Sequence, residues 1–191
     1  MKTNDEPWRE AELAKKVVEI ARSLPRRPLS EPAPAGPGVY GLYVASSRAI
    51  WGPAGTGTSC SYIGSAVNLA PRLGRHRTSF REAEGVEPAE IWFSAWVTPS
   101  WGAALYGEYL LVSALRPILN VDLPGLGSQR PGATRRGKPS PFDCVFPRSW
   151  VRQPTPIETG AAAGRLLAAL AAPGRLKTLW KPLPRPRTHG V

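Results

Sequence analysis

Cysteine, histidine and long apolar runs are scarce in this chain of 191 residues. Its two cysteines, Cys60 and Cys144, share no Cys-x-x-Cys motif or Cys/His cluster, so neither a disulfide framework nor a structural zinc site is expected. No apolar run reaches the roughly 18 residues of a membrane span, and the first residues lack the apolar segment of a signal peptide. These absences predict a reduced, soluble protein of the cytoplasm.

Acidic residues are also few, because 14 Asp and Glu stand against 25 Lys and Arg, which gives a net charge of +11. This excess predicts attraction to polyanions rather than to acidic small molecules. A hydrophobic content of 42% is too high for a disordered basic tail protein. We therefore expect one well-buried domain with tails.

The pattern along the chain predicts a small α/β sandwich, with a small antiparallel three-stranded sheet flanked by helices. Strands are expected at 39–44, 60–64 and 91–97, and helices at 7–23, from Asn68 onward, at 101–115 and at 160–171. A Pro-rich linker is expected at 25–37, and loops are expected at 46–59 and 122–141. The expected domain limits are 1–35 for the first helix and linker, 36–155 for the central domain, and 156–191 for an Ala-rich helix and basic tail.

The helix expected at 101–115 is apolar except for one charged residue, Glu108. Ser100 is its expected N-cap, a proline ends it, and Asn120 follows on an extended segment. A buried carboxylate costs several kcal/mol unless it is paired or binds a metal, whereas one on the solvent side does not. Both arrangements are open for Glu108. Gly107 favours burial, because its low helix propensity indicates a neighbour packed close to the backbone.

Two tyrosines, an arginine and a histidine form a second set of candidates. Arg72 and His76 are four residues apart, so they share one helical face. They could bind a phosphate and share in proton transfer, or they could belong to a solvated basic face. Tyr40 and Tyr62 lie on expected strands, where a phenol is either a core residue or, near cations, a group whose pKa can fall toward neutrality.

These residues together resemble the GIY-YIG nucleases over about residues 36–121. The matching elements are Gly38-Val39-Tyr40, Tyr62-Ile63-Gly64, Arg72, His76, the helical Glu108 and Asn120. One departure is that Tyr40 and Tyr62 lie 22 residues apart, roughly twice the usual gap, with the excess in the loop at 46–59.

The resemblance implies a metal-dependent hydrolysis of phosphodiester bonds. It implies that Glu108 holds one Mg²⁺, or Mn²⁺ in its place, and that Arg72 stabilises charge on the phosphate. Tyr62 would contact the phosphate, and Asn120 would hold a polar contact near the metal or the backbone. Tyr40 and His76 would together orient and deprotonate the attacking water, and which of them takes the proton stays open.

The segment after Asn120 is similar to one branch of this family, the type II restriction endonucleases that cleave the palindrome CCGCGG. The similarity is carried by Val121-Asp122-Leu123-Pro124-Gly125-Leu126-Gly127, Pro131-Gly132, Arg135-Arg136, Ser140-Pro141-Phe142-Asp143 and Pro147-Arg148-Ser149-Trp150. It implies a bacterial cytoplasmic enzyme that acts as a homodimer, with one active site for each DNA strand.

The same segment is the expected DNA-binding region. Residues 116–152 contain seven Arg or Lys against two Asp, which is typical either of a solvated basic loop or of an arm that contacts phosphates and guanines. The expected DNA contacts are Gln129, Arg130, Arg135, Arg136 and Lys138. The Gly-rich stretch at 52–58 is not followed by Lys-Ser/Thr, so no nucleotide cofactor is expected.

Two other functions are compatible with the sequence. One is a GIY-YIG nuclease of DNA repair or of a mobile element, although no further repair or DNA-binding module is recognisable. The other is a basic DNA-binding module without catalysis, in which Glu108 would have no evident reason to stand on an apolar helix.

Overall fold

The computed structural model describes residues 7–44, 60–83, 86, 88–126, 139–146, 148, 151 and 153–171. The elements in chain order are α1 (Pro7–Ser23), β1 (Arg27–Pro28), β2 (Gly38–Val44), β3 (Cys60–Ala66), α2 (Leu69–Arg81), the 3-10 turn η2 (Pro88–Glu90), β4 (Ile91–Val97), α3 (Trp101–Leu115), α4 (Ile118–Val121), α5 (Pro141–Val145) and α6 (Pro156–Ala171).

The strands form one antiparallel sheet in the order β1-β4-β2-β3. The three predicted strands are confirmed, but the prediction of a three-stranded sheet is wrong by one short edge strand. That strand, β1, lies in the segment predicted to be a linker, where Arg27 pairs with Phe93 and Pro28 pairs with Trp92. Two residues are too short to produce a periodic pattern, and proline is tolerated at a sheet edge because it need not donate a hydrogen bond there.

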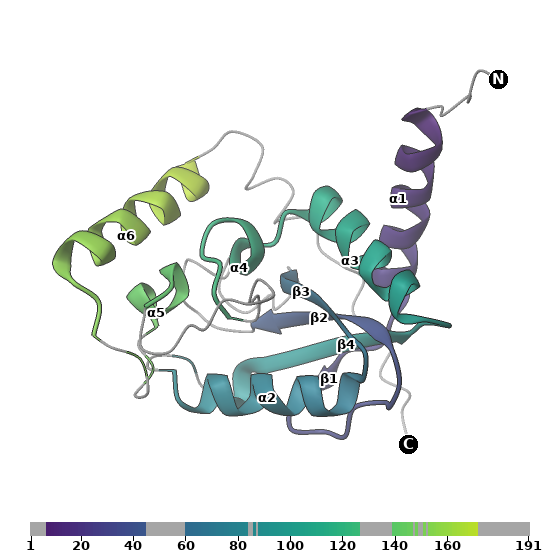
Figure 1. The fold of residues 1–191 in the computed structure, drawn as a ribbon, viewed down its shortest axis with the longest axis horizontal. Helices are drawn as coiled ribbons and strands as arrows, with labels where there is room; N and C mark the ends of the chain where they lie inside the picture. The colour runs from purple at the N-terminus through teal and green to yellow at the C-terminus, as the bar shows by residue number, and fades with distance from the viewer. Residues whose placement is uncertain are drawn as a thin grey trace, which may run out of the picture.

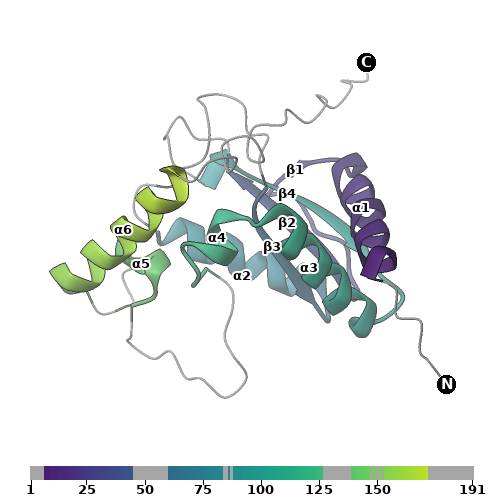
Figure 2. The same cartoon turned by 90° about the horizontal axis from the view of Figure 1, so that it is seen from above.

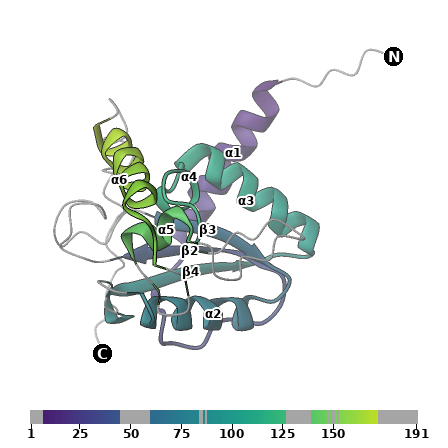
Figure 3. The ribbon, with the colours of Figure 1, turned by 60° about the vertical axis from the view of Figure 1, so that its left-hand side comes forward.

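Helices cover both faces of the sheet, so the molecule has three layers (Figures 1 and 3). Helix α2 packs on one face, and α1 and α3 lie on the other. Every residue of the central strand β2 is buried as a result. Alternate residues of β2 enter the two cores, Tyr40 and Leu42 on the α2 side and Val39 on the α3 side.

Helix α3 has the predicted limits and the predicted cap, because the Ser100 side chain accepts a hydrogen bond from the Ala103 backbone at 3.2 Å. Gly107 is buried, and a Cβ built on it would lie 3.0 Å from Cγ2 of Val39. The missing side chain therefore allows α3 to approach β2 closely, as the sequence predicts. Helix α2 begins at Leu69, one residue after its predicted start, and the Asn68 side chain caps it by accepting from the Ala70 backbone N–H.

The last part of the described chain differs more from the predictions. Asn120 lies on the short helix α4 rather than on an extended segment, because Pro117 starts a new helical turn whose backbone carbonyl accepts from Asn120 and Val121. Helix α6 begins at Pro156, four residues before its predicted start at 160. Helices α5 and α6 pack together at the end of the molecule away from α1 (Figure 2). Within the described residues, no helix is both long and apolar enough to cross a membrane.

Candidate active site

Tyr40 and His76 form the centre of the site. The Tyr40 hydroxyl and Nε2 of His76 are 2.7 Å apart, and both residues are almost fully buried. Nε of Arg72 donates a second hydrogen bond to the Tyr40 oxygen at 3.1 Å. Strand β2 and helix α2 thus bring together groups that lie more than 30 residues apart in the sequence.

Tyr62 on β3 completes an aromatic cluster around the imidazole. Its ring centroid lies 5.4 Å from that of His76 and 6.1 Å from that of Tyr40. Tyr62 also hydrogen-bonds with Arg72 and with Tyr40. Gly64 permits this cluster, because a Cβ there would lie 2.4 Å from the Tyr40 oxygen and 2.9 Å from Cε1 of Tyr62.

The alternative of a solvated basic helix face does not apply to His76, which is 2% exposed. Leu69, Leu73, His76 and Phe80 form the buried stripe of α2. Arg72 is half-buried beside this stripe, whereas Arg75 is exposed. The four-residue spacing therefore places Arg72 and His76 together, as predicted, with the imidazole turned into the core.

The two phenols are protonated in this environment. Burial, and then the neighbouring Tyr62, raise the pKa of Tyr40 well above 10, against the opposing effect of Arg72. Burial also raises the pKa of Tyr62, where Arg72 lowers it and Glu108 raises it. In the free protein neither phenol pKa falls toward neutrality, because loss of solvation outweighs the nearby cation. The phenols in turn raise the pKa of Arg72, although burial opposes this.

His76 is a neutral imidazole at physiological pH. Burial, followed by the charges of Arg72 and Arg148, lowers its pKa from 6.5 to about 3. A neutral ring can accept the Tyr40 proton at Nε2, which fits the 2.7 Å contact with a phenol that keeps its own proton. The Tyr40 oxygen then donates to His76 while it accepts from Arg72.

This pKa shift predicts how stability depends on pH. The unfolded chain binds a proton at His76 near pH 6.5, whereas the folded chain does so only near pH 3. Above pH 6.5 the imidazole is neutral in both states, so His76 leaves the free energy of unfolding unchanged there. As the pH falls from 6.5 toward 3, the unfolded chain gains the proton first, and the free energy of unfolding drops by up to about 1.4 kcal/mol per pH unit. Urea unfolding at several pH values should show that His76→Gln has a shallower acid loss than the unmutated chain. Equal slopes for the two proteins would contradict a buried neutral imidazole.

Glu108 is half-buried on α3, and its Oε2 accepts a hydrogen bond from the Ser65 hydroxyl of β3. Its charge contributes to raising the pKa values of Tyr40 and Tyr62, so the carboxylate belongs to the same site. Glu108 is thus partly exposed, and among the described residues it forms no ion pair. It is a carboxylate held at the edge strand beside two phenols.

Asn120 makes two hydrogen bonds with the backbone of Ile63. Its Oδ1 accepts from the Ile63 N–H at 2.8 Å, and its Nδ2 donates to the Ile63 carbonyl at 2.7 Å. Of the two contacts expected for Asn120, metal or backbone, the structure shows the backbone one. This residue holds α4 against β3, between Tyr62 and Gly64.

A cleft of about 610 Å³ opens beside this cluster. Among the residues that the structure describes, its lining contains three arginines and no acidic residue. The lining residues are Ser65, Ala66, Val67, Asn68, Pro71, Arg72, Arg75, His76, Ser79, Trp101, Gly125, Leu126 and Arg148. A second cavity between the sheet and α1 and α3 measures about 20 Å³, which is too small for a substrate. A third hollow, of about 440 Å³, includes Arg27 and Phe93 in its lining but none of the candidate residues. The cleft that Arg72 and His76 line is therefore the candidate substrate site, and its charge suits an anion.

Two residues of the cleft were not singled out from the sequence, Ser65 and Arg148. Ser65 directly follows the Tyr62-Ile63-Gly64 element, which was the available signal. Arg148 was noted as one charge of a basic segment and as part of the Pro147-Arg148-Ser149-Trp150 element, but not as a candidate site residue. The predicted DNA contacts Gln129, Arg130, Arg135, Arg136 and Lys138 lie outside the described residues.

Comparison of the chain with protein-family models and with curated proteins finds no match. The candidate function therefore depends on the geometry of the cleft and on the chemistry of its residues.

Proposed function

We propose that this protein is a metal-dependent endonuclease of double-stranded DNA, with phosphodiester hydrolysis at the cleft beside Tyr40 and His76. The observation that carries the proposal is the hydrogen-bonded arrangement of Tyr40, His76 and Arg72 at a basic cleft, with Glu108 close by. A cation, a proton acceptor and a carboxylate are the groups that phosphodiester hydrolysis requires. The net charge of +11 favours a polyanionic substrate.

The residues present fit one Mg²⁺ or Mn²⁺. Among the described residues, no group of three His, Cys, Asp or Glu surrounds a common point, so a cage made of protein ligands is not present there. Mg²⁺ needs no such cage, because it commonly binds one or two carboxylates and takes its other ligands from water and substrate phosphates. Glu108 supplies one carboxylate, oriented by Ser65. When bound, the ion would stabilise negative charge on the phosphate.

Tyr40 and His76 together would accept the proton of the attacking water. The Tyr40 oxygen takes that proton while its own proton passes to Nε2 of His76, across the 2.7 Å hydrogen bond. Burial of the imidazole, and then the charges of Arg72 and Arg148, oppose this transfer in the free protein, and a negative phosphate would offset the two charges in the complex. Tyr40 is 1% exposed, and of this group only Arg72 and His76 line the cleft, so the water would reach the Tyr40 oxygen past these two side chains. His76 would be the final acceptor.

Arg72 would hold the reacting phosphate. Its Nε contacts Tyr40, and its guanidinium carries further N–H donors that can meet non-bridging oxygens. Tyr62 lies beside Arg72, and its hydroxyl would donate a hydrogen bond to the same phosphate. Both tyrosines keep their protons at neutral pH, so each is able to donate.

The specific form of the proposal is a type II restriction endonuclease of the bacterial cytoplasm that cleaves the palindrome CCGCGG as a homodimer. Its support is the sequence resemblance after Asn120 and the rule that a twofold DNA site suits a twofold protein. A repair or mobile-element nuclease would share the same cleft chemistry, and it differs in the cleavage pattern.

Plasmid digestion with Mg²⁺ tests the proposal. We expect discrete fragments whose ends map to a GC-rich palindrome, and cleavage by Tyr40→Phe at least about a hundredfold slower, because the phenol no longer relays a proton. Tyr43→Phe is the matched control, since Tyr43 lies on the same strand but its hydroxyl lies 3.1 Å from that of Ser94, whereas the Tyr40 hydroxyl lies against His76. Random nicking would favour the repair or mobile-element nuclease, and binding without cleavage would contradict an enzyme.

A further inference from the structure

Arg148 is a buried arginine at the cleft that is not one of the candidate site residues expected from the sequence. It is 4% exposed, it lines the cleft together with Arg72, and its charge contributes to lowering the pKa of His76. An arginine so deeply buried needs a compensating charge, because removing it from water costs several kcal/mol.

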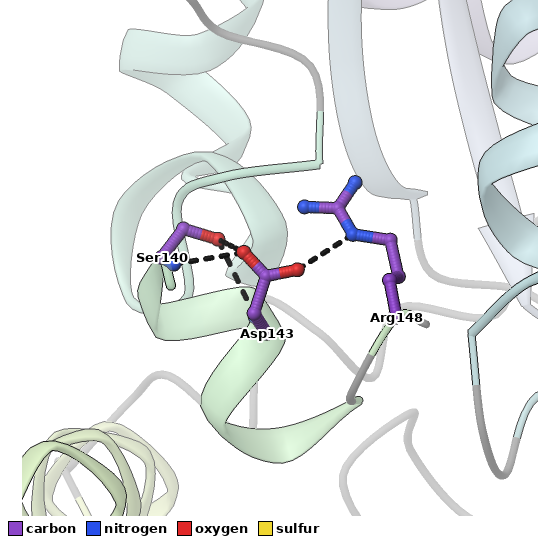
Figure 4. Close-up of polar contacts among 3 residues, drawn as sticks. All are labelled: Ser140, Asp143 and Arg148. Atoms are coloured by element: carbon purple, nitrogen blue, oxygen red, sulfur yellow. Dashed lines mark hydrogen bonds and ion pairs between the residues drawn. The ribbon is translucent and has the colours of Figure 1, made fainter. Parts of the chain in front are cut away.

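Asp143 supplies that charge (Figure 4). Its Oδ1 accepts a hydrogen bond from Nε of Arg148 at 2.6 Å, and its Oδ2 accepts from the Ser140 backbone N–H at 2.8 Å and from the Ser140 hydroxyl at 2.5 Å. Burial would raise the pKa of Asp143, but the bonds from Arg148 and Ser140 outweigh it and hold that pKa below the usual value. The carboxylate is therefore ionised, and both of its oxygens are in use.

The arginine is also held by its surroundings. Its guanidinium carbon lies 5.1 Å from the centroid of the Phe142 ring, and its backbone forms a bridge with Ala83 just after α2. The ion pair is made through Nε, the guanidinium nitrogen nearest the backbone. A side chain fixed in this way loses little freedom when it binds a ligand.

A purely stabilising role explains the pair poorly. Replacing a buried ion pair with apolar residues is often neutral or stabilising, so such a pair is weak support for a structural function. The position of Arg148 matters more, because it adds a fixed positive charge to a cleft whose described lining has no acid. Arg72 already donates a hydrogen bond to Tyr40, and it is the proposed ligand of the reacting phosphate.

We propose that Arg148 is a second phosphate-binding residue of the cleft, oriented by Asp143, that contacts the DNA backbone next to the phosphate held by Arg72. This inference rests on the proposed nuclease function and adds a residue to it. Asp143 is a positioning residue, since it acts through Arg148 rather than on the substrate.

The test is the salt dependence of duplex binding by the full chain, without divalent metal, measured by fluorescence anisotropy with a labelled GC-rich duplex over a series of NaCl concentrations. The double variant Asp143→Asn/Arg148→Met removes one charge of each sign, so the net charge stays the same and no buried charge is left unpaired. Asparagine can still accept from Ser140. We expect the slope of log K against log salt to become shallower by about one unit for each phosphate that the protein no longer neutralises.

Arg77→Met is the matched control. Arg77 lies on α2 and donates to the backbone carbonyls of Leu29 at 2.9 Å and Glu31 at 3.0 Å, outside the cleft lining. Its loss lowers the overall charge by one and weakens the fold, yet it should leave the slope nearly unchanged. Thermal unfolding of each variant confirms that the protein compared is folded.

The outcomes separate the two proposals. A shallower slope in the double variant alone supports Arg148 as a phosphate ligand. An unchanged slope in a double variant that folds, or an equal change in Arg77→Met, overturns this inference and leaves the nuclease proposal standing. Absence of duplex binding by the unmutated chain overturns both.

Discussion

Glu108→Gln is expected to reduce DNA cleavage by about a thousandfold or more, while duplex binding stays near that of the unmutated protein. The amide can still accept the Ser65 hydrogen bond, so the local packing is kept. It lacks the negative charge that would hold a divalent cation at the phosphate, and that stabilisation serves the transition state more than the bound substrate. Cleavage rates with saturating Mg²⁺, together with binding measured in EDTA, check both parts.

Glu12→Gln provides the control for this substitution. Glu12 lies on the exposed surface of α1, 3.3 Å from Lys16, so its neutralisation removes a carboxylate from the chain without touching the cleft. Cleavage should be unaffected there. If Glu108→Gln reduced binding and cleavage in parallel, Glu108 would be a structural residue, and the proposed metal site would be wrong.

Gly64→Ala is expected to abolish cleavage as well, for a steric reason. The added methyl group would lie 2.4 Å from the Tyr40 oxygen and 2.6 Å from its Cζ, so the phenol must move. Moving it breaks the hydrogen bond to His76 and disturbs the contact with Arg72. Crowding of this kind in a packed core costs about 1–3 kcal/mol of unfolding free energy.

Gly74→Ala tests the opposite case on the neighbouring helix. Gly74 is in the middle of α2. Apart from the adjacent backbone of the helix, no heavy atom of the described residues lies within 4 Å of a Cβ built on it. Alanine is the better helix former, so we expect a gain of about 0.4–1 kcal/mol with cleavage unchanged. Urea unfolding and plasmid digestion of the pair give the comparison. Full activity in Gly64→Ala would show that Tyr40 does not need its present position.

The parts of this molecule that were predictable are those that local sequence determines. Short apolar stretches predicted the three long strands to within two residues of their ends. Ser100 predicted the capped start of α3, and the pattern from Asn68 predicted the start of α2. Gly107 also indicated its own close packing. Strand β1 and helix α4 were missed because two and four residues are too few for a period to appear.

The sequence predicted that these candidate residues lie near one another, but it did not predict how deeply each is buried or how its pKa is shifted. Spacing placed Arg72 and His76 on one face, but only the packing of α2 on the sheet shows that His76 is buried and neutral. The direction of the Tyr40 pKa depends on burial and charge together, and burial is the larger effect. Arg148 acquires its place from a contact with Asp143 and a bridge to Ala83 that no local pattern encodes.

The contact between Asn120 and Ile63 has a consequence for self-association. Strand β3 is an outer strand of the described sheet, and such a strand can recruit a strand from another molecule through its unused backbone groups. The Asn120 amide occupies the N–H and carbonyl of Ile63 in the manner of a neighbouring strand. Pro28, which has no N–H to donate, stands on the opposite outer strand. Both outer strands of the described sheet thus carry a residue that hinders pairing with a further strand. The proposed homodimer would therefore use helices and loops rather than strand pairing as its contact surface.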